Sequence, residues 1–169
     1  RASARPRPVM VYFHGGAYSS GSVTDPLNDG ARLADRGDVV VVTVNHRINV
    51  FGYLYLPESF PDSGNNGQLD LICALKWVQR NIAAFGGNPE RVTIFGESAG
   101  SFDVCAHVAS PMSAGLFHRA IVQSAGLRVV SIDEGEHLTD DPAPGRRHSS
   151  NELILALFAT NCLQALIAA

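Results

Sequence analysis

Apolar residues fall into two alternating patterns along the chain, and the alternation predicts the fold class. Short, nearly continuous apolar runs at residues 8–13, 39–44, 91–95 and 119–124 are typical of strands. The β-branched run at 39–44 predicts a strand covered on both faces. Helical patterns separate these runs. We therefore expect an α/β chain whose mostly parallel sheet carries helices on both faces.

The clearest helical pattern covers about residues 68–85. Its apolar positions recur at i, i+4, i+7 and i+11, namely at Leu71, Leu75, Val78 and Ile82. Asn66 is the expected N-cap, and the run Gly86-Gly87-Asn88-Pro89 ends the helix. We expect Trp77, Cys73 and Cys105 to be core residues. A weaker helix is expected over residues 27–36, and another from Ser98 to about residue 109.

The chain divides into three expected parts. Residues 1–126 carry the alternating pattern and form the α/β core, with a long connection at 45–67 that is rich in Gly, Pro, Asn and Ser. Residues 127–151 are polar and predict a surface loop or linker. Residues 152–169 predict a C-terminal helix, and because this segment is short for a bilayer span we favour a packed helix over a membrane helix.

Composition narrows the functional classes. Hydrophobic residues make up 46% and charged residues 17%, which is the balance of a globular protein rather than a disordered one. The net charge is -3 and the 13 Lys and Arg form no long run, so no nucleic-acid partner is expected. Three cysteines fit neither a zinc site nor a disulfide framework. Residues 1–8 contain no signal-peptide pattern, which slightly favours a cytoplasmic location.

The strongest chemical signal is the run Gly96-Glu97-Ser98-Ala99-Gly100 between a predicted strand and a predicted helix. A serine raised on a tight strand-to-helix turn needs small neighbours two positions on either side. Such a turn exposes Oγ and directs the backbone N–H of Ala99 toward a developing oxyanion. Ser98 is therefore the candidate nucleophile.

A second signal, His14-Gly15-Gly16-Ala17-Tyr18, follows the first predicted strand. Small residues allow main-chain N–H groups to approach a substrate oxygen without obstruction from side chains. In combination with the serine turn, this run predicts the other half of an oxyanion hole. Tyr18 and Phe102 flank the predicted site, where they either touch an acyl group or pack the core.

With these motifs the chain resembles the type-B carboxylesterase family, which includes the cholinesterases and has the α/β-hydrolase fold. The resemblance covers roughly residues 9–126. It implies a partial α/β-hydrolase fold and a serine carboxylic-ester hydrolase that forms an acyl-enzyme on Ser98. It also implies an oxyanion hole formed by Gly16, Ala17 and Ala99, support from the Glu97 carboxylate, a small-molecule ester substrate, and no metal or organic cofactor. The matching runs are residues 14–18, 45–52, 66–70, 74–89, 95–101 and 115–124.

Five departures from the family pattern stand out. The family places its triad acid and histidine well downstream, and no such segment is found here, so we expect both to lie outside the chain. The family's Asp-Gln pair becomes Asp70-Leu71, and Asp103 stands where a small residue is usual. Residues after Gly126 do not match, and the early strands that precede the glycine motif are missing. An ion pair between Arg47 and Asp70 is expected beneath the site.

Alternatives for the catalytic base remain within the sequence. Asp103 and His107 are an i,i+4 pair, but His107 lies nine residues beyond Ser98, roughly 13 Å along a helix axis, too far for a base that must come within about 3 Å. His137 and His148 follow Ser98 near several acidic residues, so a compact, complete hydrolase is one alternative. A non-catalytic, cholinesterase-like binding module is the other. The nearby acidic residues are Asp133, Glu134, Asp140 and Asp141.

Overall fold

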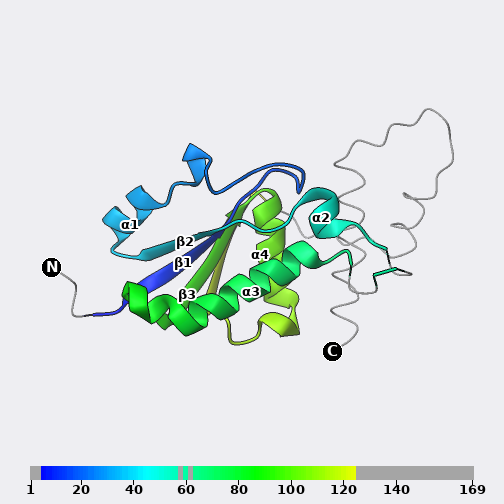
Figure 1. Cartoon of the computed structure of the whole chain (residues 1–169). Coiled ribbons are helices and arrows are strands. Elements are labelled where there is room, and N and C mark those ends of the chain that lie inside the picture. The colour runs from blue at the N-terminus through cyan, green and yellow to red at the C-terminus, as the bar shows by residue number, and fades with distance from the viewer. Residues whose placement is uncertain (1–4, 57–58, 61–62, 125–169) are drawn as a thin grey trace.

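Four strands form one parallel sheet in the computed structural model, which describes residues 5–56, 59–60 and 63–124 (Figure 1). The strands follow the order β2-β1-β3-β4, and every neighbouring pair is parallel. Their bounds are Arg7–Phe13 for β1, Val40–Val44 for β2, Gly87–Glu97 for β3 and Arg119–Gln123 for β4. The expected α/β class with a parallel sheet is confirmed.

The helices cover both faces of this sheet. One face packs against the long helix α3 and against α4, while the short helix α1 covers the other face beside β2. Helix α2 and three 3-10 turns fill the connections. The bounds are Pro26–Asn28 for η1, Ala31–Gly37 for α1, Asn49–Tyr53 for α2, Asn66–Asn81 for α3, Ile82–Phe85 for η2, Ala99–Ala109 for α4 and Pro111–Ser113 for η3.

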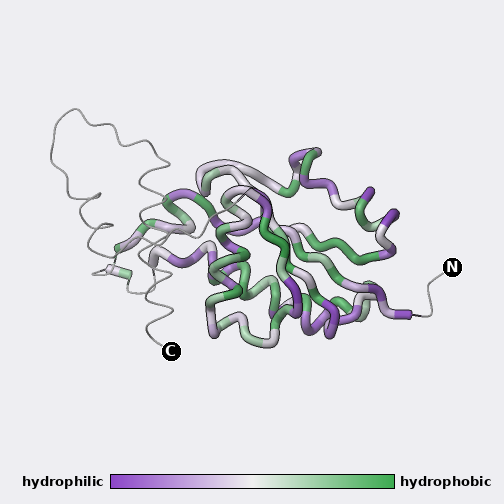
Figure 2. Tube along the Cα trace, turned by 180° about the vertical axis from the view of Figure 1, so that it is seen from behind, coloured by the Kyte–Doolittle hydropathy of each residue, from purple (hydrophilic) through white to green (hydrophobic). Residues whose placement is uncertain are grey.

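The core lies between the central strands and α3. In β1 the side chains of Val9, Val11 and Phe13 are 0% exposed, and they alternate with half-buried residues on the other face. Leu71 and Leu75 of α3 pack onto this row. Figure 2 shows the result as hydrophobic strands in the centre of the molecule with hydrophilic segments at its rim. The alternating apolar residues of β1 and the apolar face of α3 therefore pack against each other in one layer.

Helix α3 begins and ends close to the expected places. Its first residue is Asn66, so the N-cap is Asn65 rather than Asn66. The predicted helix to residue 85 consists of α3 and the 3-10 turn η2, and Gly86 ends it with φ 78°. The weaker helix expected at 27–36 is divided into η1 and α1.

The expectation that Trp77 and Cys73 belong to the core is wrong. Trp77 is 45% exposed and packs its ring against Phe85, with centroids 5.7 Å apart. Cys73 is exposed, and Cys105 is half-buried. Trp77 directly precedes the buried Val78, and successive residues on a helix lie about 100° apart, so Trp77 points away from the sheet.

The outer strands differ from the expectation for residues 39–44. Within the described part of the chain, β2 and β4 form the two edges of the sheet. β2 is half-buried rather than covered on both faces, and every residue of β4 is exposed. An apolar composition therefore predicted the strands but not their positions in the sheet.

The expected linker at 127–151 and the C-terminal helix at 152–169 lie outside the described residues. Among the helices that the structure describes, none combines the length and apolar character needed to cross a bilayer.

Candidate active site

The two glycine-rich motifs lie side by side because the strands that precede them are neighbours. β1 and β3 pair in parallel register up to Phe13 and Gly96, so both motifs begin at the same edge of the sheet. A Cβ atom built on Gly15 would lie 3.2 Å from Cβ of Ser98. The carboxyl ends of parallel strands are where α/β proteins place their ligands.

Ser98 occupies a strained turn between β3 and α4. Its φ and ψ are 53° and -122°, a conformation that side chains other than glycine rarely adopt. The serine is the N-cap residue of α4, and its carbonyl accepts hydrogen bonds from the N–H of Ser101 at 2.9 Å and the Oγ of Ser101 at 2.6 Å. The side chain is half-buried, at the start of a helix. Strain at such a position is typical of a nucleophile turn.

The glycines on either side of Ser98 are required by close backbone contacts. A Cβ on Gly96 would lie 2.3 Å from the carbonyl oxygen of Gly100. A Cβ on Gly100 would lie 2.0 Å from the carbonyl oxygen of Phe13 at the end of β1. The steric reason expected for the Gly-x-Ser-x-Gly spacing therefore holds in the structure.

The glycine loop, residues 14–21, is also strained and is fixed in place by several hydrogen bonds. Gly16, Ala17 and Tyr18 have φ values of 119°, 52° and 58°. The carbonyl of Gly16 accepts hydrogen bonds from the N–H groups of Ser19 and Ser20, both at 3.0 Å. Within the described residues, no hydrogen bond uses the backbone N–H of Gly16, Ala17 or Ala99. These are the three N–H groups that the sequence predicted as oxyanion donors.

Tyr18 joins the glycine loop to α4. Its side chain is 2% exposed, and its hydroxyl donates to the carbonyl of Ala99 at 3.0 Å. Its own carbonyl accepts from the N–H of Asn49. The ring packs edge-on against Tyr53 with centroids 4.8 Å apart. Of the two roles considered for Tyr18, these contacts correspond to packing, and the half-buried Phe102 packs against the same cluster.

Glu97 directly precedes Ser98 and is exposed. A Cβ on Gly15 would lie 3.0 Å from its Oε2, so this carboxylate lies against the glycine loop. It therefore contributes negative charge beside both motifs.

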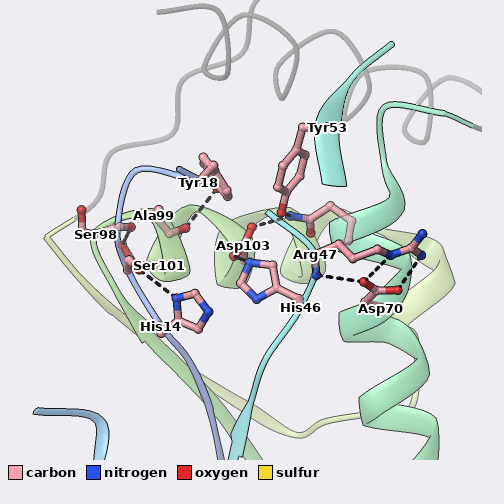
Figure 3. A network of polar contacts seen from close by, with 12 residues as sticks. His14, Tyr18, His46, Arg47, Tyr53, Asp70, Ser98, Ala99, Ser101 and Asp103 are labelled. Carbon is pink, nitrogen blue, oxygen red and sulfur yellow. Dashed lines mark hydrogen bonds and ion pairs between the residues drawn. The ribbon is translucent and has the colours of Figure 1, made fainter. Parts of the chain in front are cut away.

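Beneath the two motifs lies a floor of buried polar side chains (Figure 3). His14 and His46 stack with ring centroids 4.8 Å apart, and Nε2 of His46 lies 3.7 Å from Oδ2 of Asp103. Gln68 of α3 donates a short hydrogen bond from Nε2 to Oδ1 of Asp103. Four segments that are distant in the sequence therefore meet under the turn that carries Ser98.

Burial shifts the pKa values in this floor in opposite directions. It raises the pKa of Asp103 to about 7, although hydrogen bonds from Gln68 and Tyr18 act to lower it. Burial, with a contribution from the neighbouring His14, lowers the pKa of His46 to about 4. The neutral forms of both groups are favoured because a charge there would lose its hydration. The sequence showed Asp103 as a departure from the family pattern and as a partner considered for His107, but not as a buried group with a raised pKa.

The expected ion pair between Arg47 and Asp70 is confirmed. Nη2 of Arg47 lies 2.7 Å from Oδ1 of Asp70, and Nε and the backbone N–H of Arg47 donate to Oδ2 at 2.8 Å and 2.9 Å. Burial of Asp70 opposes ionisation, but the hydrogen bonds from Arg47 outweigh it and lower the pKa of Asp70. This pair links the chain after β2 to the first turns of α3.

The described histidines do not contact Ser98 by hydrogen bonds. Nδ1 of His107 lies 2.8 Å from Oγ of Ser113, and burial lowers its pKa to about 4. The considered pair between Asp103 and His107 does not form, because the hydrogen bonds of Asp103 go to Gln68 and Tyr18. His137, His148 and the acidic residues near them lie outside the described residues.

The described residues contain no group of three or more His, Cys, Asp or Glu side chains arranged to hold a metal ion.

Comparison with protein families gives a match between residues 1–138 and the model of the Carboxylesterase family. The match extends beyond residue 126, where the motif resemblance ended. A para-nitrobenzyl esterase of Bacillus subtilis is 49% identical over 129 residues, which are 75% of this chain and 26% of that protein. A cocaine esterase of Oryctolagus cuniculus is 54% identical over 117 residues, 69% of this chain and 21% of that protein.

Solved structures give the same result for the fold. A PNB esterase structure superposes with a TM-score of 0.73 and 37% identity over 98% of this chain and 35% of its own chain. A carboxylesterase of Geobacillus stearothermophilus superposes with a TM-score of 0.72 and 36% identity over 97% of this chain and 41% of its own. The chain thus spans roughly a quarter of the length of the sequence relatives it matches.

Proposed function

This chain belongs to the carboxylesterase family, and from that membership we propose that it carries the nucleophile and oxyanion-hole portion of a serine carboxylic-ester hydrolase. The observation that carries the proposal is the position of Ser98, which caps α4 in a strained turn directly beside the glycine loop. A nucleophile needs an exposed Oγ with oxyanion donors nearby, and both motifs begin at the same sheet edge.

In the proposed reaction, Oγ of Ser98 attacks the ester carbonyl carbon while a base removes the hydroxyl proton. The N–H groups of Gly16, Ala17 and Ala99 stabilise the tetrahedral oxyanion, and their lack of acceptors among the described residues supports this role. Collapse of the tetrahedral intermediate releases the alcohol and leaves an acyl-enzyme, which water then hydrolyses to the acid. This chemistry requires no metal or organic cofactor.

The base and its supporting acid are proposed to come from outside residues 5–124. The support is that His14, His46, His107 and His118 of that segment all have other contacts, and none hydrogen-bonds Ser98. Glu97 is proposed to support the site electrostatically, because its carboxylate lies against the glycine loop and would favour a protonated histidine beside Ser98.

The substrate is proposed to be a small carboxylic ester. The relatives include a para-nitrobenzyl esterase and a cocaine esterase, whose names give different esters. Family membership therefore supports the ester bond as the common element.

The test is labelling of the purified chain with a fluorophosphonate, combined with turnover of short-chain p-nitrophenyl esters. If the base lies elsewhere, we expect slow labelling that is lost in Ser98→Ala, and no turnover above background. Ser110→Ala, a half-buried serine at the far end of α4, is the matched control and should label like the unchanged chain. Labelling that persists in Ser98→Ala would contradict the assignment of the nucleophile.

Turnover would instead support the compact hydrolase, and its loss on replacing His137 or His148 with Ala would identify the base. A folded chain without any labelling would support a non-catalytic binding module.

A further inference from the structure

The strongest unassigned feature is the buried carboxyl group of Asp103, which lies in α4 five positions after Ser98. Its side chain is 0% exposed, and two hydrogen-bonding groups from other segments reach it. Gln68 of α3 donates to Oδ1, and the hydroxyl of Tyr18, from the glycine loop, also forms a hydrogen bond to the carboxyl. Figure 3 shows Asp103 between Tyr18 and His46.

The hydroxyl of Tyr18 is within hydrogen-bonding reach of two acceptors, the carbonyl of Ala99 at 3.0 Å and the carboxyl of Asp103. A phenol has one hydrogen to donate and can accept others on its oxygen. A protonated Asp103 can donate a hydrogen bond to the Tyr18 oxygen, and the Tyr18 hydroxyl then continues to donate its own hydrogen to the carbonyl of Ala99. An ionised Asp103 is the stronger acceptor, because charge-assisted hydrogen bonds are roughly twice as strong as neutral ones.

The surroundings of Asp103 favour its protonated form. The titratable groups that face it are Tyr18 of the glycine loop, His46 after β2 with His14 stacked behind it, and Tyr53 of α2 through Gln68. His107 lies one turn further along α4, and the nearest arginine, Arg47, is paired with Asp70. In the described part of the chain, no lysine or arginine forms an ion pair with Asp103.

We propose that Asp103 is a positioning residue. Its protonated carboxyl group maintains the hydrogen bond from the Tyr18 hydroxyl to the carbonyl of Ala99, and this bond holds the glycine loop against α4. Ionisation of Asp103 draws the phenol hydrogen to the carboxylate, and the bond between the loop and Ala99 is lost. The pKa of about 7 that burial gives to Asp103 places this change near neutral pH.

The effect of Asp103 on catalysis rests on the proposed function. Ala17 and Ala99 are two of the proposed oxyanion donors, and Tyr18 directly follows the first and forms a hydrogen bond to the second. Ala17 and Tyr18 both have positive φ, a strained conformation that surrounding contacts must hold, and the bond from Tyr18 to Ala99 is one of these contacts. The protonation state of Asp103 would therefore set how well the oxyanion hole is formed, through Tyr18 and without contact with the substrate.

The experiment is amide hydrogen exchange of the full chain at several pH values between 5.5 and 8.5, expressed as protection factors. The reporters are the amides of Ser19, Ser20 and Asn49, each of which bonds to a carbonyl of the glycine loop. Ile94 in the β1–β3 ladder is the reference. We expect the reporters, but not Ile94, to lose about tenfold protection as pH rises through 7, the factor that one hydrogen bond supplies.

Three variants make this test specific. Asp103→Asn keeps the size of the side chain and cannot ionise, so protection should stay high at pH 8.5. Tyr18→Phe removes the hydroxyl, so protection should be low at every pH, with no step. Tyr53→Phe is the matched control, because it also removes a buried hydroxyl near Gln68 but leaves the link between Tyr18 and Asp103, and it should keep the step.

The proposal would be overturned by an unchanged step in Asp103→Asn, by its absence from the unmodified chain, or by an equal step at Ile94. If Asp103→Asn fails to fold, Tyr18→Phe and Tyr53→Phe still decide, since a step present in both variants contradicts the proposal. The readout does not depend on labelling of Ser98, so failure of the proposed function and failure of this inference are distinguishable.

Discussion

Gly100→Ala is expected to lower the stability of the chain more than any other single-methyl addition at the site. The new Cβ would lie 2.0 Å from the carbonyl oxygen of Phe13 and 2.8 Å from that of His14. These are backbone atoms at the end of a central strand, so a side-chain rotation cannot relieve the contact. Overpacking of this kind costs about 3 kcal/mol, which corresponds to a midpoint of thermal unfolding lower by roughly 10 °C.

Thermal unfolding followed by circular dichroism measures this effect. Gly37→Ala is the matched control, because a Cβ on Gly37 would have only Val39 as a neighbour, at 3.4 Å, within the helix α1. Glycine is less favourable than alanine in a helix, so the control should change stability by no more than about 1 kcal/mol. Equal midpoints for the two variants would show that α4 does not approach β1 as closely as the structure indicates.

Asp103→Asn is expected to make the chain more stable than the unmodified protein at alkaline pH. The gain in stability should be smaller at acidic pH. The folded pKa of Asp103, about 7, lies above its ordinary value of 3.8. The folded state therefore holds a proton that the unfolded state releases, and this stability is present below pH 3.8 and is lost as pH rises through 7. Asparagine does not titrate. The free-energy difference between the two proteins should grow by roughly 3 kcal/mol between pH 5 and pH 8.

Urea unfolding at four pH values measures the free energy of unfolding for this comparison. Asp70→Asn is the control with the opposite sign, because the hydrogen bonds from Arg47 lower the pKa of Asp70. Asp70 contributes stability above its unfolded pKa, and this contribution disappears as pH falls. Asp70→Asn should therefore be less stable than the unmodified chain at pH 7 and similar to it in acid. A constant difference between Asp103→Asn and the unmodified chain would mean that Asp103 is not buried.

Some features of the fold could be predicted because they depend on neighbours in the sequence. The apolar spacing of Leu71, Leu75 and Val78 predicted the buried face of α3, since a helix repeats every 3.6 residues wherever it packs. The same reasoning gave a wrong prediction for Trp77. This residue lies one position outside the apolar face of the helix, and one position is enough to move a side chain from the core to the surface. The position of β2 at the edge of the sheet, as far as the described residues form it, also could not be predicted, since strand order depends on pairing between distant segments.

The candidate site also has features that the sequence predicts and features that only the tertiary structure shows. By itself, the sequence determined the family and the strained turn at Ser98, because the steric need for Gly96 and Gly100 acts within five residues. Only the tertiary structure decided the state of Asp103. A carboxyl group in a helix is ordinarily solvated, and the burial that raises its pKa comes from the packing of α3, the glycine loop and the segment after β2 around it. Desolvation depends on all the atoms that surround a group, and a local sequence pattern does not show which distant segments supply them.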